Sequence, residues 1–142
     1  MFRLISGNAK IEHYPKAAST AFSQGGLVYW NGSGFIIPAD ATSGDHAGVV
    51  LKAVAATDDD YADTTKLPVQ IADTDAIFEA DVETGTLTVA MVGNQYDLVA
   101  DGDAIDVTGT SKKVVTIVGY KSATKALVKI NAVATNANVA TS

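Results

Sequence analysis

The sequence predicts an all-β protein, with a small β-sandwich or barrel-like body and an extended N-terminal arm. Its apolar residues are mainly valine and alanine, and they are interspersed with threonine, glycine, aspartate and asparagine, a composition typical of strands and turns. Short β-prone runs are separated by turn residues at intervals of about ten residues, as in sandwiches and small barrels. Helical proteins instead carry leucine, glutamate, lysine and arginine in periodic blocks, which this chain lacks.

Residues 1–24 predict an extended arm rather than a helix. Large apolar residues occur there, but Gly7 and Pro15 lie too close together for a stable helix between them. Two alternatives for burying the apolar side chains remain open: the arm adds an edge strand to its own domain, or it pairs as an added strand with a partner. The expected organisation is an arm over 1–24, a β-rich body over 25–131 and a flexible C-terminal tail over 132–142.

The clearest local signal is a β-hairpin at the start of the body. Two β-prone runs, Leu27–Trp30 and Phe35–Pro38, flank the loop Asn31–Gly34. The Asn-Gly pair in that loop supplies the positive φ angles that a tight hairpin needs. Pro38 has no N–H to donate to a ladder, so it marks the end of the second strand.

The rest of the body is expected to contain further short strands. Each is a run of β-branched and other apolar residues that ends at glycine, asparagine or acidic residues, and Leu67, Val69 and Ile71 show the alternation of a half-buried strand. The expected strands cover residues 48–55, 66–72, 77–82, 86–92, 104–108, 114–118 and 126–130.

Charge is distributed unevenly along the chain. Fifteen of the sixteen acidic residues lie between Asp40 and Asp106, a stretch with two lysines, whereas both ends of the chain are net positive. This division suits a protein that docks by its ends onto an acidic surface. We expect the acidic loops to face solvent and the basic ends to approach that surface, so raised salt should weaken attachment.

The composition argues against several classes of protein. The chain has no cysteine, which excludes disulfides and thiolate metal sites. The start lacks an apolar run long enough for a signal peptide, and no stretch approaches the ~18–20 apolar residues that span a bilayer. The net charge of −6, with lysines not interleaved with aromatics, disfavours nucleic-acid binding. We expect a soluble protein made in the cytoplasm, with neither a membrane nor a nucleic acid as partner.

No catalytic residue and no cofactor is expected. The histidines are His13 and His46, and no Gly-x-Ser-x-Gly motif accompanies them, so a serine triad has no support. Trp30, beside Tyr29, is interpreted as a core or interface anchor rather than a sugar platform.

Three groups of acidic residues are weighed as metal ligands. None has the twelve-residue spacing of a calcium-binding loop. Solvated loops are the main interpretation, a weak cation site is the alternative, and no metal is expected. The groups are Asp58–Asp60 with Asp63, Asp73 with Asp75, and Asp101 with Asp103.

Four segments of the chain bear a resemblance to a known family. They are Gly25–Ala39, Gly48–Leu51, Val69–Ala72 and Met91–Leu98. In this succession, after an apolar-spotted arm, the chain resembles the small capsid decoration, or cement, proteins of tailed bacteriophages. The likeness is one of pattern, covers residues 20–130, and contains no invariant motif.

The resemblance implies a non-enzymatic structural protein on the outer surface of a viral capsid. Its partners would be the major capsid protein and neighbouring copies of itself, as homotrimers, and it would stabilise the shell by clamping adjacent subunits. The alternative is another virion or surface β-module, such as a tail-tube, head-fibre or adhesin-like carbohydrate-binding domain. Tyr29 and Trp30 are a possible interface, and the arm residues expected to contact the capsid are Phe2, Arg3, Leu4, Ile5, Lys10, Ile11 and Tyr14.

Overall fold

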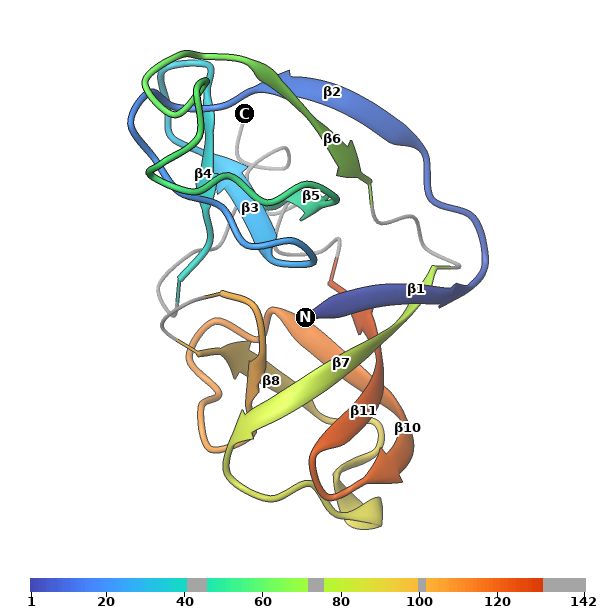
Figure 1. The fold of residues 1–142 in the computed structure, drawn as a ribbon. Coiled ribbons are helices and arrows are strands. Elements are labelled where there is room, and N and C mark those ends of the chain that lie inside the picture. The colour runs from blue at the N-terminus through green and yellow to red at the C-terminus, as the bar shows by residue number, and fades with distance from the viewer. Residues whose placement is uncertain (41–45, 72–75, 100–101, 132–142) are drawn as a thin grey trace.

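The computed structural model describes residues 1–40, 46–71, 76–99 and 102–131, and it confirms the all-β class that the sequence predicts (Figure 1). Of the residues that the structure describes, 48% lie in strands and 3% in helix, so the fold is described by its sheets. The strands form two sheets, each of them curled. We call them the upper barrel and the lower barrel, after their positions in Figure 1.

The upper barrel is a five-stranded antiparallel sheet in the order β2-β6-β5-β3-β4. A parallel bridge between Lys16 and Ile36 brings its two edges together, and the Ala17 N–H donates to the Ile36 carbonyl at 3.0 Å. The bridge curls the sheet into a nearly closed barrel. Its strands are β2 (Ile11–Pro15), β3 (Leu27–Trp30), β4 (Ile36–Pro38), β5 (His46–Val50) and β6 (Lys66–Gln70).

The lower barrel has the strand order β1-β7-β11-β10-β8-β9. A parallel pairing of β9 with the C-terminal half of β7 closes five of these strands into a ring, and β1 pairs with the N-terminal half of the same β7 edge. The strands are β1 (Phe2–Ser6), β7 (Ile77–Thr84), β8 (Gln95–Leu98), β9 (Ile105–Asp106), β10 (Val115–Ser122) and β11 (Lys125–Ile130).

The N-terminal segment crosses both barrels. β1 runs antiparallel to β7, β2 runs antiparallel to β6, and between them the Ile71 N–H donates to the Lys10 carbonyl at 2.7 Å. The N-terminal segment therefore forms a two-stranded ribbon, first with β7 through β1 and then with β6 and Ile71 through Lys10 and β2 (Figure 1). Of the two alternatives for the arm, the structure shows the first, in which the extended N-terminal segment adds edge strands to the chain's own sheets.

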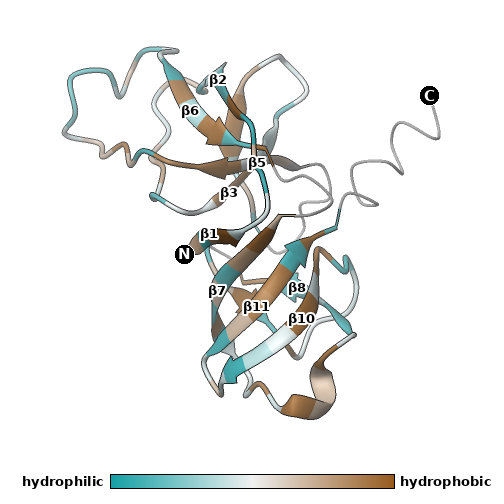
Figure 2. Ribbon diagram, turned by 90° about the vertical axis from the view of Figure 1, so that its right-hand side faces the viewer, coloured by the Kyte–Doolittle hydropathy of each residue, from teal (hydrophilic) through white to brown (hydrophobic). Residues whose placement is uncertain are grey.

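Each barrel has its own apolar core, and two strands contribute to both. Leu27 of β3 and Val49 of β5 pack into the lower core, whereas their neighbours Val28 and Val50 pack into the upper core. Successive strand residues point to opposite faces, so one sheet can serve two cores. Figure 2 shows the apolar stretches of β7 and β11 in the lower barrel.

The hairpin prediction is confirmed by the pairing of β3 with β4, and most of the other expected strands are present. The strand predicted over 86–92 is wrong: this segment contains a short 3₁₀ turn, η1 (Val89–Met91). The pattern fails because no strand of the described part pairs with this segment, and Val89 is 66% exposed. No strand was predicted where β8 (Gln95–Leu98) lies.

Candidate functional site

The residues expected to contact a partner divide into buried and exposed groups. Phe2 is 2% exposed in the lower core, and its N–H donates to the Gly25 carbonyl at 2.7 Å. The Phe2 side chain is therefore occupied within its own chain in this structure, and its contact with a capsid stays a prediction. Leu4 packs against the same core, and Tyr14 packs against the upper core. The exposed members are Arg3, Ile5, Lys10 and Ile11.

We call Arg3, Ile5, Lys10 and Ile11 the exposed ribbon surface. Ile5 is 45% exposed at the end of β1, and Ile11 is 50% exposed at the start of β2, on either side of the turn at Gly7. Gly7 has a φ of 79°, which a residue with a Cβ seldom adopts. The ribbon thus holds two large apolar side chains in solvent, next to two cations: Ile11 is paired with Gln70, and Ile5 lies at the register shift between the paired residues Leu4 and Ser6.

The basic ends of the chain meet its acidic middle on the outside of the lower barrel. Arg3 contacts Glu79 at 3.1 Å, Lys121 also binds Glu79, and Lys125 lies 2.5 Å from Asp81. The ammonium group of Met1 binds Asp81 at 3.2 Å. These pairs neutralise part of the charge division within the chain itself, which the expectation of docking by the basic ends did not foresee.

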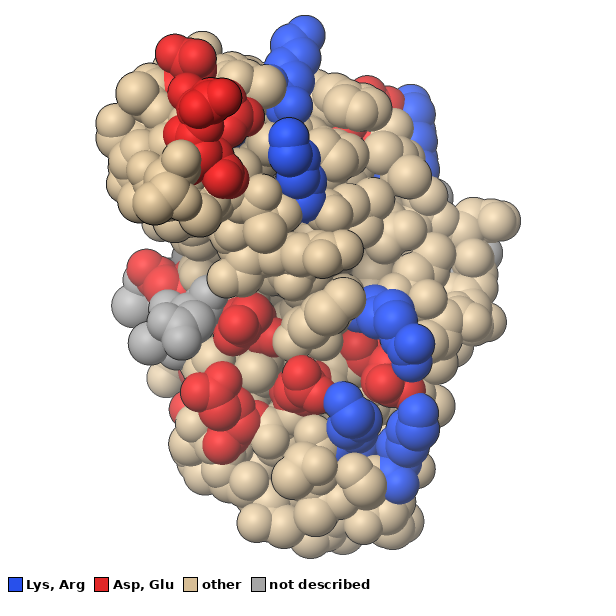
Figure 3. All heavy atoms as spheres, viewed as in Figure 1, with Lys and Arg blue, Asp and Glu red and all other residues tan. Residues whose placement is uncertain are grey.

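The ion pairs perturb the carboxyl groups in a consistent direction. The hydrogen bond from Lys121 is the largest cause that holds the pKa of Glu79 below its usual value. The hydrogen bond from Lys125 does the same for the pKa of Asp81, and Asp81 in turn raises the pKa of Lys125. Figure 3 shows basic and acidic side chains side by side on this part of the lower barrel. The cluster ties β1 to β7, β10 and β11.

Acidic side chains also bind backbone N–H groups. Asp97 is 7% exposed, and its carboxylate accepts the backbone N–H groups of Ser111, Lys112 and Lys113 at 3.0, 2.7 and 2.8 Å. Asp97 lies on β8, so it is a buried acid outside the loops that are expected to face solvent. Asp58, in the acidic turn, accepts the Ala55 N–H at 2.8 Å.

Lys16 is a buried cation that sequence reasoning missed. It is 0% exposed, and its ammonium donates to the carbonyls of Tyr61 and Asp63, each at 2.7 Å. The ammonium also lies 5.9 Å from the centre of the Tyr61 ring. Lys16 therefore anchors the acidic turn to the seam of the upper barrel. The acid-rich segment near Tyr61 was the available signal, but it lies 45 to 47 positions from Lys16 along the chain.

The predicted interface aromatics face different ways. Trp30 is 37% exposed, and its ring lies 4.6 Å from that of Tyr14, tilted by 57°. Tyr29, the next residue back along β3, packs against the lower core. Trp30 thus presents an aromatic face near the β2 edge, whereas Tyr29 supports the junction between the barrels.

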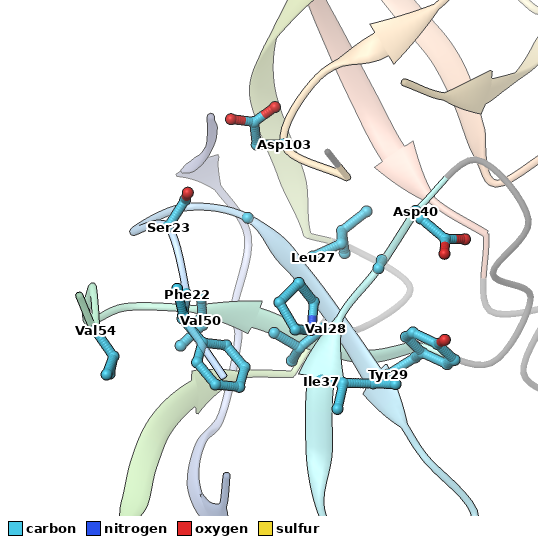
Figure 4. A pocket seen from close by; sticks show the side chains of 14 residues that line it. Phe22, Ser23, Leu27, Val28, Tyr29, Ile37, Asp40, Val50, Val54 and Asp103 are labelled. Atoms are coloured by element: carbon cyan, nitrogen blue, oxygen red, sulfur yellow. The ribbon is translucent and has the colours of Figure 1, made fainter. Parts of the chain in front are cut away.

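A cavity of about 680 Å³ lies beside that junction. In Figure 4, Phe22 and Val54 lie on one side of it and Tyr29 and Ile37 on the other, and Asp103 lines it from the lower barrel. Phe22 and Val54 are only 4% and 2% exposed, so the cavity offers little apolar side-chain surface to a ligand.

The described part of the chain holds no group of three or more histidine, cysteine or acidic side chains placed to bind a metal ion. Of the weighed acids, Asp73, Asp75 and Asp101 lie outside the described residues. His13 is exposed on β2, and His46 begins β5. No helix in the described residues is both long and apolar enough to cross a membrane.

Comparison with known protein families finds no family that matches the sequence, and comparison with curated proteins finds no match either.

Proposed function

We propose that the chain is a non-enzymatic structural protein that binds the outer surface of a viral capsid and stabilises it by clamping neighbouring major capsid protein subunits. The observation that supports this most is the exposed ribbon surface. Ile5 and Ile11 are about half exposed, and burial of two such side chains in a partner would contribute a few kcal/mol, at about 25 cal/mol per Å² of apolar area.

The pairing of the ribbon favours its use as a docking element. A free arm must be ordered when it binds, and that ordering costs free energy. Ile5 and Ile11 lie on strands already paired with β7 and β6, so little backbone conformational entropy is lost on docking. The ribbon also belongs to both barrels, so a partner that binds it is connected to both sheets through main-chain hydrogen bonds. Many copies on one lattice would multiply a modest affinity.

The first test is co-sedimentation of the purified protein with expanded capsids that lack it. We expect the wild type to pellet with the capsids at micromolar concentration, and protein that stays in the supernatant would remove the proposal. Deletion of the first sixteen residues is a poor variant, because it removes β1 and β2 from their sheets.

Substitution of exposed side chains gives a sharper test. The double variant Ile5→Asp with Ile11→Asp should weaken capsid binding by at least tenfold, or about 1.4 kcal/mol. The matched control is Val89→Asp, which alters a 66% exposed apolar residue at the opposite end of the lower barrel. Equal binding by both variants would show that the ribbon is not the docking surface. Circular dichroism checks that both remain folded.

A second candidate function is a carbohydrate-binding surface module. The contact of the partly exposed Trp30 with Tyr14 favours it, since an exposed aromatic face can pack against a sugar ring. Binding to a glycan array that is lost in Trp30→Ala but kept in the Ile5 and Ile11 variant would favour this alternative over the capsid.

A further inference from the structure

The loop Asn31–Gly34 contains the one Asn-Gly pair of the sequence, and the proposed function makes no use of its chemistry. We propose that Asn31 is a modification site, at which the side-chain amide is lost spontaneously in the folded protein through a cyclic imide formed with the backbone nitrogen of Gly32. Asparagine is among the thermolabile residues. The structure adds four features that leave the reaction open at this position.

The attacking nitrogen is accessible. Asn31 and Gly32 are both exposed at the tip of the hairpin, and the Gly32 N–H makes no hydrogen bond with the described residues. Gly32 has a φ of 86°, and no atom lies within 4 Å of the place that a Cβ would take. A base in solvent can therefore reach the N–H, and no side chain on Gly32 obstructs ring closure.

The carbon under attack is polarised. The Oδ1 of Asn31 accepts the backbone N–H groups of Ser33 at 2.8 Å and of Phe35 at 3.3 Å. Both bonds draw electron density away from Cγ, which makes it a better electrophile. They also fold the side chain over the loop that follows it, as in an Asx turn. The amide nitrogen Nδ2, which must leave, is not held by any of the described residues.

The reaction needs only water. Base removes the Gly32 N–H proton, the nitrogen bonds to Cγ of Asn31, and the Cγ–Nδ2 bond breaks as ammonia leaves with a proton. Water then opens the imide by breaking one of its two C–N bonds. Opening at Cγ leaves an ordinary aspartate, and opening at the backbone carbonyl leaves an isoaspartate, whose main chain runs through Cβ and Cγ.

The two products should affect the hairpin differently. An ordinary aspartate keeps an acceptor oxygen where Oδ1 was, so the bonds from Ser33 and Phe35 can persist. An isoaspartate lengthens the main chain between Trp30 and Gly32, which displaces Trp30 from its contact with Tyr14. Trp30 is the sole tryptophan of the chain, so tryptophan fluorescence reports on the surroundings of this one residue.

The test is to hold the folded protein at mildly alkaline pH for several days and to follow each asparagine by peptide mass spectrometry. Isoaspartate is counted by labelling with an isoaspartyl methyltransferase. Asn8 and Asn94 are internal controls, because both are exposed but precede residues with side chains, Ala9 and Gln95. The variant Asn31→Asp supplies the reference for the ordinary product.

We expect Asn31 to lose its amide several-fold faster than Asn8 and Asn94. The purified isoaspartyl form should show a red-shifted Trp30 emission that Asn31→Asp does not show. A rate at Asn31 no faster than at Asn8 would overturn the proposal. Retention of the Asn31 amide in the folded protein, with loss only in urea, would overturn it as well, because the fold would then protect the site.

Discussion

The two barrels are closed by different means. In the lower barrel, β9 pairs with β7 over Val82 and Thr84, and the ring encloses the larger of the two apolar cores. In the upper barrel, the edges meet at the bridge of Lys16 with Ile36, and the buried Lys16 ammonium fastens the adjoining turn. The comparison teaches that main-chain pairing closes both sheets, and that the upper barrel, which has the smaller apolar core, adds a buried polar clamp beside its seam.

The lower core should show the largest effect. Phe78, near the start of β7, is 0% exposed, so Phe78→Ala should lower the free energy of unfolding by about 3–5 kcal/mol. Chemical denaturation measures this loss. Because Leu27 and Val49 of the upper barrel pack into the same core, we expect both barrels to unfold in one transition. Two separate transitions would instead show that the upper barrel is stable alone.

Loss of the polar clamp, the bonds of the Lys16 ammonium to the 61–63 turn, should have the second-largest effect on stability. Lys16→Met leaves the carbonyls of Tyr61 and Asp63 without their donor, which should cost about 3 kcal/mol. Lys10→Met is the control, because the Lys10 side chain is 75% exposed. Hydrogen exchange at the Ser19 N–H, which donates to the Tyr61 carbonyl at 2.8 Å, should accelerate in the first variant only. Similar stability of the two variants would mean that the clamp is dispensable.

The junction between the barrels can be tested by a pair of glycines. A Cβ on Gly102 would lie 2.0 Å from the Ala39 carbonyl oxygen, whereas a Cβ on Gly93 would meet nothing within 4 Å. Both have positive φ, 72° and 94°, so both alanine variants share the strain of about 1–3 kcal/mol. We expect Gly102→Ala to lower the melting temperature further than Gly93→Ala. Equal decreases in melting temperature would show that the backbone at Ala39 can move away from a Cβ on Gly102 without loss of stability.

The ion cluster of the lower barrel should have the smallest effect, and it should depend on pH. The pKa values of Glu79 and Asp81 are lowered in the folded protein, so their contribution to stability is present above the ordinary carboxyl pKa of about 4 and is lost as pH falls through the lowered values. Melting curves should show stability falling below about pH 4. Glu79→Gln should flatten this dependence, and an unchanged pH profile would assign no role to the pair with Lys121.

Local signals predicted much of the fold. The Asn-Gly loop identified the β3–β4 hairpin, and the alternation of Leu67 and Val69 identified β6. The segment 86–92 alternates as a strand does, yet strand formation needs a neighbour with free peptide groups, which sequence periodicity cannot reveal. The role of Asp97 could not be predicted for a similar reason, because its three backbone donors come from a loop fourteen to sixteen positions away.

The candidate site was predicted less completely. Ile5 and Ile11 were identified from composition, but Phe2 in the same segment is buried, because its burial depends on β7, which lies far along the chain. The bond between Arg3 and Glu79 joins residues 76 positions apart, and that between Lys121 and Glu79 joins residues 42 apart. Local pattern carries no information on such pairings, so the internal neutralisation of charge was invisible before the structure.

The ribbon has a consequence for the order in which the chain is completed during synthesis. The strands of the upper barrel, β2 to β6, are encoded between β1 and its partner β7. When β1 leaves the ribosome, Ile77 has yet to be made, so β1 must wait while the whole upper barrel emerges. Contacts so distant along the chain form late and slowly. We therefore expect β1 to pair only after β2 to β6 have been made.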